Sequence, residues 1–374
     1  MLVRPNVPAL NPESIMRRFL LVLPAIALAV ACSDRNPLAP PPSPAFNITS
    51  PPPSARTITV MTQNLYIGAN VDLVIQALIT PDPNDDFAAL MAAIETVGKT
   101  AYPARAEAIA DEIARARPHA VGLQEVSDID IDLQPLGVPL AVHQHFLEIL
   151  QDALARRGLH YQVAAIVTDV NASLLGGLVN LVDHDALLVD GDRVTVDAAS
   201  GQNFAANIGP VPGTPISLIR GWVWARTTID GQAYTFASAH TEAGTSDPLL
   251  KQLRAAQVGE MVATLGSSTP LVLMGDLNDT PGSPMYQILA GSGFTDSWVS
   301  LRPGAEGLTC CHVADLSDPV AQFDQRIDYI WTRGFGDNVQ GSVDRFGNVP
   351  ADRVVGPAYP IWPSDHAGLL ASLR

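Results

Sequence analysis

Two apolar segments of the sequence end abruptly in an acidic side chain. Residues 120–124 read Ala-Val-Gly-Leu-Gln and are followed by Glu125, and residues 270–275 form a second apolar run that ends in Asp276. A strand that is apolar on both faces has to be covered on both faces, which places it inside a layered fold. A carboxylate at the end of such a strand is costly to bury unless it is paired or bound to a metal ion. The sequence therefore predicts covered sheets whose strand ends carry charged groups.

Strand and helix patterns alternate along the chain. Thr57–Leu65 is rich in β-branched residues, which favours a strand, whereas Ala104–Arg117 and Val142–Arg157 have helical patterns. Asp185–Val196 and Trp222–His240 each carry a turn sequence between apolar runs, which predicts two hairpins. Antiparallel pairs beside strand–helix units indicate an α/β fold with mixed sheets. Three poorly patterned stretches are expected to be surface loops: residues 66–100, 127–140 and 197–216.

The beginning of the chain has the layout of an export signal. Two arginines precede an apolar run over residues 19–31 that ends in small residues directly before Cys32. The run is shorter than the ~20 apolar residues that cross a bilayer as a helix. We expect residues 1–32 to be a signal peptide with a lipobox, Met16 to be the more plausible first residue, and Cys32 to be lipidated. Ordinary secretion and a retained anchor are the alternatives, so the protein is expected to be a periplasmic or outer-surface lipoprotein or a secreted protein.

A proline-rich segment separates this signal from the folded part. Residues 33–56 hold eight prolines among small polar residues, which is typical of an extended linker. At about 3.1 Å per residue, such a segment reaches up to roughly 70 Å from a membrane. At about 150 residues per domain, length alone would suggest two domains, although large α/β enzymes often use this length for one. Because residues 57–374 contain neither a repeat nor another linker, we expect one domain there.

The charge balance disfavours some functions. The chain has 22 Lys and Arg against 38 Asp and Glu, a formal net charge of −16. Non-specific binding of nucleic acid needs a broad basic face, which this composition does not favour, although a local basic or metal-bearing cleft is compatible with it. Three cysteines are too few for a disulfide scaffold, and their spacing fits no zinc pattern. Cys310 and Cys311 are adjacent and form either two thiols or a vicinal disulfide.

The candidate site consists of polar groups at separate strand or loop ends. Asp276 and Asn278 flank Leu277, so in an extended segment their side chains point the same way. A carboxylate placed like Glu125 can hold a hard divalent cation through oxygen. Histidine titrates near neutrality and serves acid–base chemistry. The candidates are Asn64, Glu125, His240, Asp276, Asn278, Asp328, Asp365 and His366.

These residues lie in six short motifs that follow one another along the domain: Thr62–Leu65, Gly122–Val126, Ala239–Glu242, Gly275–Asp279, Arg326–Tyr329 and Ser364–His366. No single motif is specific, but the six in this order resemble the signatures of the endonuclease/exonuclease/phosphatase superfamily. That family includes deoxyribonuclease I-like nucleases, abasic-site endonucleases, bacterial sphingomyelinases and inositol-polyphosphate phosphatases. The resemblance implies a four-layered α/β/β/α sandwich of two packed mixed β-sheets flanked by helices.

The resemblance also implies a metal site. Glu125 would bind a divalent cation with Asn64 beside it, and Asp365 would complete this site or a second one. The ion would be Mg²⁺, with Mn²⁺ or Ca²⁺ as alternatives, in one or two copies.

The remaining motif residues would serve the reaction. Asp276 would orient or deprotonate the attacking water, and Asn278 would hold a phosphate oxygen. Asp328 would pair with His366. His240 would stabilise charge in the transition state or protonate the leaving oxygen. Water would then attack phosphorus in line.

The implied function is a secreted or lipid-anchored, divalent-metal-dependent phosphoester hydrolase, above all of phosphodiesters, that acts as a monomer. Its substrate would be nucleic acid, a phospholipid headgroup or a small organic phosphate, so an extracellular nuclease and a sphingomyelinase-like enzyme are alternatives within the family. Ser127 stands where nucleases of the deoxyribonuclease I type carry a basic residue, which weakens the nuclease interpretation. Outside the family, the alternative is a non-catalytic surface binding protein.

Several polar residues have structural interpretations. Arg105 and Arg254 lie in helical patterns and are expected on solvated faces. Asp183-His184-Asp185 resembles a metal motif but precedes a strand, which favours a structural role, and Glu242 is expected to be solvated or to support His240. Asp328 has an ion pair with nearby Arg326 as its structural alternative.

Overall fold

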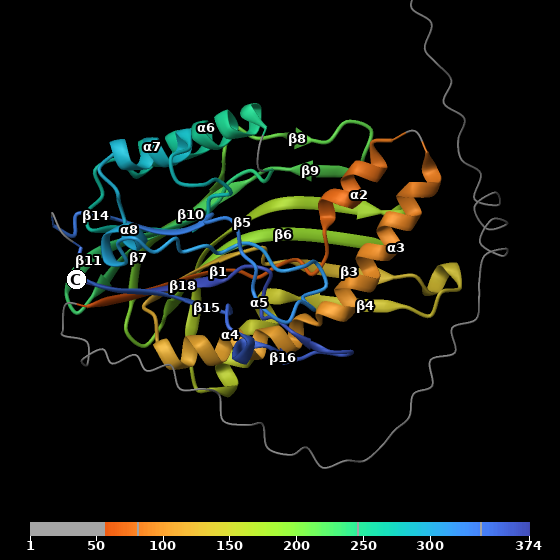
Figure 1. The fold of residues 1–374 in the computed structure, drawn as a ribbon, viewed down its shortest axis with the longest axis horizontal. Helices are drawn as coiled ribbons and strands as arrows, with labels where there is room; N and C mark the ends of the chain where they lie inside the picture. The colour runs from red at the N-terminus through yellow and green to blue at the C-terminus, as the bar shows by residue number, and fades with distance from the viewer. Residues whose placement is uncertain (1–56, 81, 245–246, 337–338) are drawn as a thin grey trace, which may run out of the picture.

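Two mixed β-sheets form the centre of the molecule (Figure 1). The computed structural model describes residues 57–80, 82–244, 247–336 and 339–374. The predicted signal peptide, Cys32 and the proline-rich linker lie outside the described residues. Among the described residues, no helix is both long and apolar enough to cross a membrane.

The first sheet has ten strands, of which eight run in the order β15-β18-β1-β2-β6-β5-β9-β8, while β3 pairs with β4 and β6. Its strands are β1 (Ile58–Asn64), β2 (Ala120–Gln124), β3 (Asp128–Asp132), β4 (Ala141–His145), β5 (Tyr161–Leu174), β6 (Val179–Asp190), β8 (Gly209–Pro210), β9 (Ile216–Leu218), β15 (Gly341–Phe346) and β18 (Gly368–Leu373).

The second sheet has six strands in the order β13-β14-β12-β11-β10-β7. They are β7 (Thr195–Asn203), β10 (Gly221–Ile229), β11 (Gln232–His240), β12 (Leu271–Asp276), β13 (Thr295–Asp296) and β14 (Asp328–Arg333). A short pair, β16 (Val354–Val355) with β17 (Pro360–Ile361), stands apart from both sheets. The helices are α2 (Val71–Leu78), α3 (Pro83–Thr100), α4 (Tyr102–Ala116), α5 (Phe146–Arg156), α6 (Pro248–Leu265), α7 (Pro284–Gly291) and α8 (Ser297–Leu301).

Strand β12 shows why the two sheets stack. Leu271 and Leu273 face α6 and α7, whereas Val272 and Met274 point into the core between the sheets. The four side chains are fully buried, so each stabilises the fold by about 1.5–3 kcal/mol relative to exposure. The expected coverage of both strand faces is therefore confirmed.

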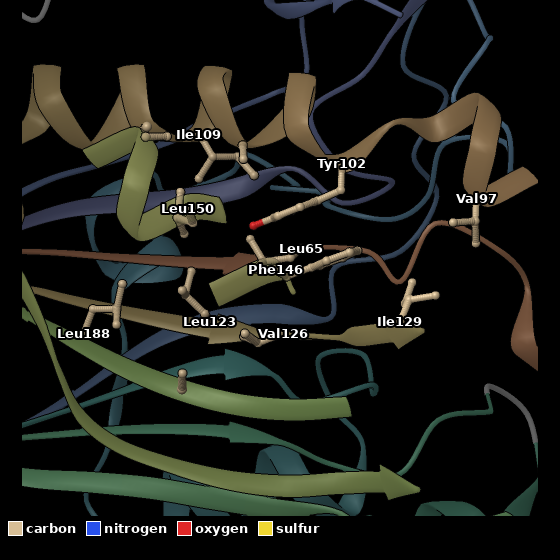
Figure 2. Packing of buried hydrophobic residues seen from close by; sticks show 14 of the residues in the cluster. Leu65, Val97, Tyr102, Ile109, Leu123, Val126, Ile129, Phe146, Leu150 and Leu188 are labelled. Atoms are coloured by element: carbon tan, nitrogen blue, oxygen red, sulfur yellow. The ribbon is translucent and has the colours of Figure 1, made fainter. Parts of the chain in front are cut away.

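The outer face of the first sheet is covered by α4 and α5. Figure 2 shows Ile109 of α4 and Leu150 of α5 packed toward Leu123 of β2 and Leu188 of β6. Helices α6 and α7 cover the opposite side of the molecule (Figure 1). The predicted four-layered α/β/β/α sandwich is thus confirmed.

Most predicted elements are present. Thr57–Leu65 contains β1, Ala104–Arg117 overlaps α4, and Trp222–His240 is the β10–β11 hairpin. Val142–Arg157 is only partly helical, because α5 begins at Phe146 after β4 has paired with β3.

The predicted hairpin at Asp185–Val196 is wrong. Strand β6 pairs with β2, β3 and β5 in the first sheet, whereas β7 pairs with β10 in the second. The turn after Asp190 therefore carries the chain from one sheet to the other. A turn sequence predicts that the chain reverses direction, but it does not specify which sheet each flanking strand joins.

The three predicted loops are also wrong in part. Residues 66–100 contain α2 and α3, and Leu90, Ile94 and Val97 of α3 pack on the first sheet at helical spacing. Residues 127–140 contain β3, and residues 197–216 contain most of β7, all of β8 and the first residue of β9.

Candidate active site

The ends of the central strands bring the predicted residues together. Parallel pairing sets Asn64 beside Gln124, which immediately precedes Glu125. In the second sheet, His240 pairs in register with Asp276, and Asp276 pairs with Asp328. Because β1 and β12 belong to facing sheets, the two sets of strand ends meet across the sandwich.

A glycine permits the close approach of β11 and β12. Gly275 has a positive φ of +137°, and a Cβ at this position would lie 2.0 Å from the carbonyl oxygen of Ala239. A larger residue would therefore separate His240 from Asp276. The glycine of the Gly-Asp-x-Asn sequence thus has a direct role in building the site.

Asn64 links the two sheets. Its Nδ2 donates to Glu125 Oε1 at 3.0 Å and to Asp276 Oδ2 at 3.1 Å, while its Oδ1 accepts from the Tyr66 amide at 2.9 Å. Glu125 Oε2 also accepts from the Ile67 amide at 2.8 Å, and Glu125 itself has a left-handed backbone with φ +54°. Both carboxylates are therefore oriented by the same side-chain amide.

Asp276 is buried among other charged groups. Burial and the negative charge of Asp328 raise the pKa of Asp276 to about 7. Its Oδ1 accepts from the Asn278 amide at 2.9 Å, and Asn278 Nδ2 donates to the Thr241 carbonyl at 3.1 Å. The contact between the Asn278 amide and Asp276 Oδ1 is an Asx turn, and the side-chain oxygen of Asn278 takes part in neither contact.

His366 forms the predicted pair with Asp328. His366 Nδ1 lies 2.9 Å from Asp328 Oδ2, whereas Arg326 pairs with Asp296 at 2.7 Å instead of Asp328. Burial opposes protonation of His366, but the carboxylates of Asp328, Asp365 and Asp276 outweigh it and raise the pKa of His366 well above its ordinary value.

Asp365 and Glu125 are the more accessible carboxylates of the site. Both are half-buried, while Asp276 and Asp328 are buried. Burial and the negative charge of Glu125 raise the pKa of Asp365 to about 7, against the lowering effect of His366. Ser364 Oγ donates to the Asn64 carbonyl at 2.6 Å, which ties the Asp365 segment to the end of β1.

His240 lies between two carboxylates. Its Nε2 is 3.7 Å from Asp276 Oδ2, and its Nδ1 is 3.7 Å from Asp185 Oδ1. Arg220 Nη1 lies 3.0 Å from Nδ1 and 3.4 Å from Nε2. Burial and the positive charge of Arg220 hold the pKa of His240 well below its ordinary value, so the imidazole is neutral near pH 7.

The sequence interpretation missed a buried group behind His240. Asp169, Asp183, Asp185 and Arg220 gather there, and Glu242, expected to be solvated or to support His240, is buried at 3 % exposure. The two-residue spacing of Asp183 and Asp185 in an apolar strand was the available signal.

The expectation that two helical arginines are solvated is wrong. Arg105 is fully buried and donates to the carbonyls of Leu65, Tyr66 and Pro363, which joins the loop after β1 to the segment before Asp365. Arg254 is also fully buried. Its Nε lies 3.1 Å from Asp279 Oδ2, so it braces the loop that follows Asn278.

Cys310 and Cys311 lie at the rim of this site. The structure joins them in a disulfide, one of the two alternatives left open by the sequence. Cys311 Sγ is 3.8 Å from His366 Nε2, which places the cysteine pair beside the Asp328–His366 contact.

Comparison with known proteins agrees with this arrangement. Residues 96–366 match the Endonuclease/Exonuclease/phosphatase family. No match was found among curated protein sequences.

Solved structures share the fold at low sequence identity. An endonuclease/exonuclease/phosphatase from Beutenbergia cavernae has a TM-score of 0.54 and 18 % identity, over 85 % of this chain and 72 % of that one. The mannosyl-6-phosphatase Bt3783 of Bacteroides thetaiotaomicron has a TM-score of 0.51 and 19 % identity, over 85 % and 99 %. Humanized TDP2 of D. rerio has a TM-score of 0.50 and 15 % identity, over 86 % and 100 %. The chain therefore belongs to the endonuclease/exonuclease/phosphatase family, whose members are phosphoesterase hydrolases.

Proposed function

We propose that the protein is an exported, divalent-metal-dependent hydrolase of phosphodiesters. The observation that carries this proposal is the bridge from Asn64 to Glu125 and Asp276, set beside the Asp328–His366 pair. It combines oxygen ligands for a hard cation with a buried carboxylate and a protonated imidazole. Hydrolysis of a phosphoester needs such positioning and charge stabilisation.

The residues at the end of β2 fit a divalent cation. Glu125 and Asp365 are half-buried carboxylates whose charges disfavour one another, as the raised pKa of Asp365 indicates. Hard cations prefer such oxygen ligands, so these two residues would hold Mg²⁺, or Mn²⁺ or Ca²⁺ in its place. When bound, the ion would supply positive charge against the phosphate. Asn64, whose Nδ2 donates to Glu125 and Asp276, would support the site by fixing both carboxylates.

The other residues would act on the proton and the developing charge. Asp276, with a pKa of about 7, would accept a proton from the attacking water. The positively charged His366, held by Asp328, would stabilise negative charge on the phosphoryl oxygens. The neutral His240 would donate a hydrogen bond through Nε2, and Asn278 would hold a phosphate oxygen.

The substrate is proposed to be a phospholipid headgroup or a small organic phosphate. The net charge of −16 disfavours tight binding of a long polyanion. Ser127, which stands where related nucleases carry a basic residue, is buried and donates to Asp183 at 2.6 Å. The name of the mannosyl-6-phosphatase neighbour points to a sugar phosphate for that protein, which keeps a phosphomonoester as a second candidate here. An extracellular nuclease is the remaining alternative.

Hydrolysis of bis-p-nitrophenyl phosphate tests the reaction class. Purified protein should cleave it with Mg²⁺ or Mn²⁺ and lose this activity in chelator. Glu125→Gln should lower kcat by at least about a hundredfold, whereas the matched exposed control Glu306→Gln should keep it. A folded protein without turnover on phosphodiesters or phosphomonoesters would refute the proposal and favour a binding protein.

Salt dependence separates the substrate classes. A nuclease that contacts several phosphates loses affinity by orders of magnitude between 50 and 200 mM salt, because affinity falls as a power of the salt concentration whose exponent grows with the number of phosphate contacts. We expect less than about a threefold rise in KM for a soluble phosphodiester over this range. A steep rise on DNA with efficient cleavage would favour the nuclease alternative.

Export and anchoring are proposed from the sequence before Cys32. The apolar run and the small residues preceding this cysteine are the supporting feature. The processed protein should carry a lipid and fractionate with membranes, whereas Cys32→Ser should be released. An unprocessed chain in the cytoplasm would contradict this proposal.

The protein is also proposed to be a monomer, and size-exclusion chromatography should show one.

A further inference from the structure

Three buried aspartates behind His240 have more carboxylate oxygens than hydrogen-bond donors. Asp169, Asp183 and Asp185 are each 0 % exposed. Within the described part of the chain, both side-chain oxygens of Asp169, both of Asp185 and Oδ2 of Asp183 receive no hydrogen bond from a donor group, although Asp169 and Asp185 lie close enough to share a proton. Burying such atoms without a partner is costly, so this cluster needs either protons or a cation.

Strand geometry aims these side chains at one point. Asp183 and Asp185 are two residues apart on β6 and therefore lie on the same face. The pairing of β5 with β6 shifts register at Asp169, and such a bulge redirects the side chain of the extra residue. His240 ends β11 in the facing sheet. The cluster is thus built from both sheets.

Three of these groups have the spacing of metal ligands. A carboxylate oxygen of Asp169, one of Asp185 and a ring nitrogen of His240 lie within 4.8 Å of one another. The 3.7 Å between His240 Nδ1 and Asp185 Oδ1 is too long for a hydrogen bond. Two ligand atoms that each lie about 2.0–2.2 Å from a shared ion are separated by roughly 3–4 Å, which fits this gap.

The lone pair of His240 Nδ1 is available. Arg220 Nη1 is nearly equidistant from the two ring nitrogens, at 3.0 and 3.4 Å. It therefore lies over the ring face and not along the lone pair of Nδ1.

The charge balance points to a cation as well. Four buried carboxylates, those of Asp169, Asp183, Asp185 and Glu242, surround one guanidinium, Arg220. Among the described residues Arg220 pairs with Glu242 at 3.6 Å and forms no ion pair with Asp169 or Asp185. When the four carboxyl groups are ionised, a divalent ion would compensate most of their excess negative charge, which protons would otherwise have to neutralise.

We propose that Asp169, Asp185 and His240 Nδ1 hold a divalent cation, separate from the ion expected at Glu125 and Asp365. Two carboxylates and one imidazole suit Mn²⁺ or Zn²⁺ better than Mg²⁺. Coordination through Nδ1 leaves the hydrogen on Nε2, the nitrogen that faces Asp276, and so sets the tautomer of His240. The site does not rest on the proposed reaction.

Counting Mn²⁺ per chain tests this site. Purified full-length protein is dialysed against Mn²⁺, and tightly bound ions are measured by elemental analysis and electron paramagnetic resonance. Wild type should hold two ions, and Asp169→Asn and Glu125→Gln should each hold one. Asp183→Asn, the same change in the same buried cluster but outside the ligand set, should keep two.

Several results would overturn the proposal. They are an unchanged ion count in Asp169→Asn, an equal loss in Asp169→Asn and Asp183→Asn, and no ion at all in Glu125→Gln. The ion count in Glu125→Gln tests the proposal even if Asp169→Asn does not fold, because it is measured on a different variant. Two bound ions without hydrolysis would refute the proposed function alone, whereas hydrolysis with one ion would refute this site alone.

Discussion

The two histidines of the candidate site each face a buried aspartate, yet they differ in charge. His366 lies 2.9 Å from Asp328, and surrounding carboxylates raise its pKa. His240 lies 3.7 Å from Asp185, and burial with Arg220 overhead lowers its pKa. A carboxylate neighbour alone therefore does not keep a buried histidine protonated. The hydrogen-bond distance and the sign of the next charge decide the outcome.

Removing the carboxylate beside His366 should have the largest effect. Asp328→Asn keeps the shape of the pair but removes the charge that holds His366 protonated. We expect kcat for a chromogenic phosphodiester to fall by about 10²–10⁴-fold, and the pKa of His366, followed by NMR, to fall as well.

The control is another buried carboxylate. Asp296 pairs with Arg326 at 2.7 Å on the same sheet. Asp296→Asn should lower stability and leave kcat nearly unchanged. A kcat within tenfold of wild type for Asp328→Asn would show that the charge of His366 is not used in the reaction.

Removing the positive charge beside His240 should make the two histidines more alike. Arg220→Met leaves the four carboxylates of the buried cluster without their guanidinium, so we expect unfolding free energy to fall by about 3–5 kcal/mol. With divalent cations removed, the pKa of His240 should rise. Denaturant unfolding and histidine NMR measure these two effects.

Arg302→Met is the matched control, because Arg302 forms an exposed ion pair with Asp344. It should change stability by less than about 1 kcal/mol. If Arg220→Met left the pKa of His240 unchanged, burial alone would explain the neutral imidazole, and the role assigned to Arg220 would be wrong.

The contrast between the histidines could not be predicted from sequence, although their positions could. Asn64, His240 and Asp276 end their strands and Glu125 directly follows one, and pairing of neighbouring strands brings such ends together. The two-face apolar pattern of β12 likewise predicted a layered fold.

The sequence does not predict contacts between residues that lie far apart along the chain. Arg105 is buried because its guanidinium reaches carbonyls such as that of Pro363, 258 residues away in the chain. Asp169 faces His240 because of a bulge in β5 that no local pattern marks. Helical periodicity and turn sequences describe neighbours within one element, so they do not report these approaches.

A third buried histidine tests the same electrostatic effect on a pKa at a position that has no part in the reaction. His119 lies outside the site, and burial with the positive charge of Arg193 lowers its pKa to about 4. In the unfolded chain the pKa of this histidine is about 6.5. Between pH 6.5 and 4 the unfolded chain therefore binds a proton that the folded protein does not bind, and the free energy of unfolding falls as the pH falls through this range.

This histidine should account for about 1.5 kcal/mol of stability lost between pH 6.5 and pH 5. Denaturant unfolding at the two pH values measures it, with His119→Gln as the variant in which this part of the loss disappears. An unchanged pH dependence in His119→Gln would show that His119 is protonated in the folded protein. Burial beside an arginine would then not keep this histidine neutral, in contrast to His240.

An exposed carboxylate–histidine pair should matter least. His143 Nδ1 lies 2.8 Å from Asp130 Oδ1, as close as the Asp328–His366 contact, but the two side chains are 65 % and 44 % exposed. Water and salt screen this pair, so Asp130→Asn should change unfolding free energy by less than about 1 kcal/mol and leave kcat unaltered. A loss comparable to that of Asp328→Asn would mean that short distance, not burial, determines the strength of these pairs. The small expected effect therefore tests a condition that the two buried histidines share, namely that desolvation gives the neighbouring charges their influence.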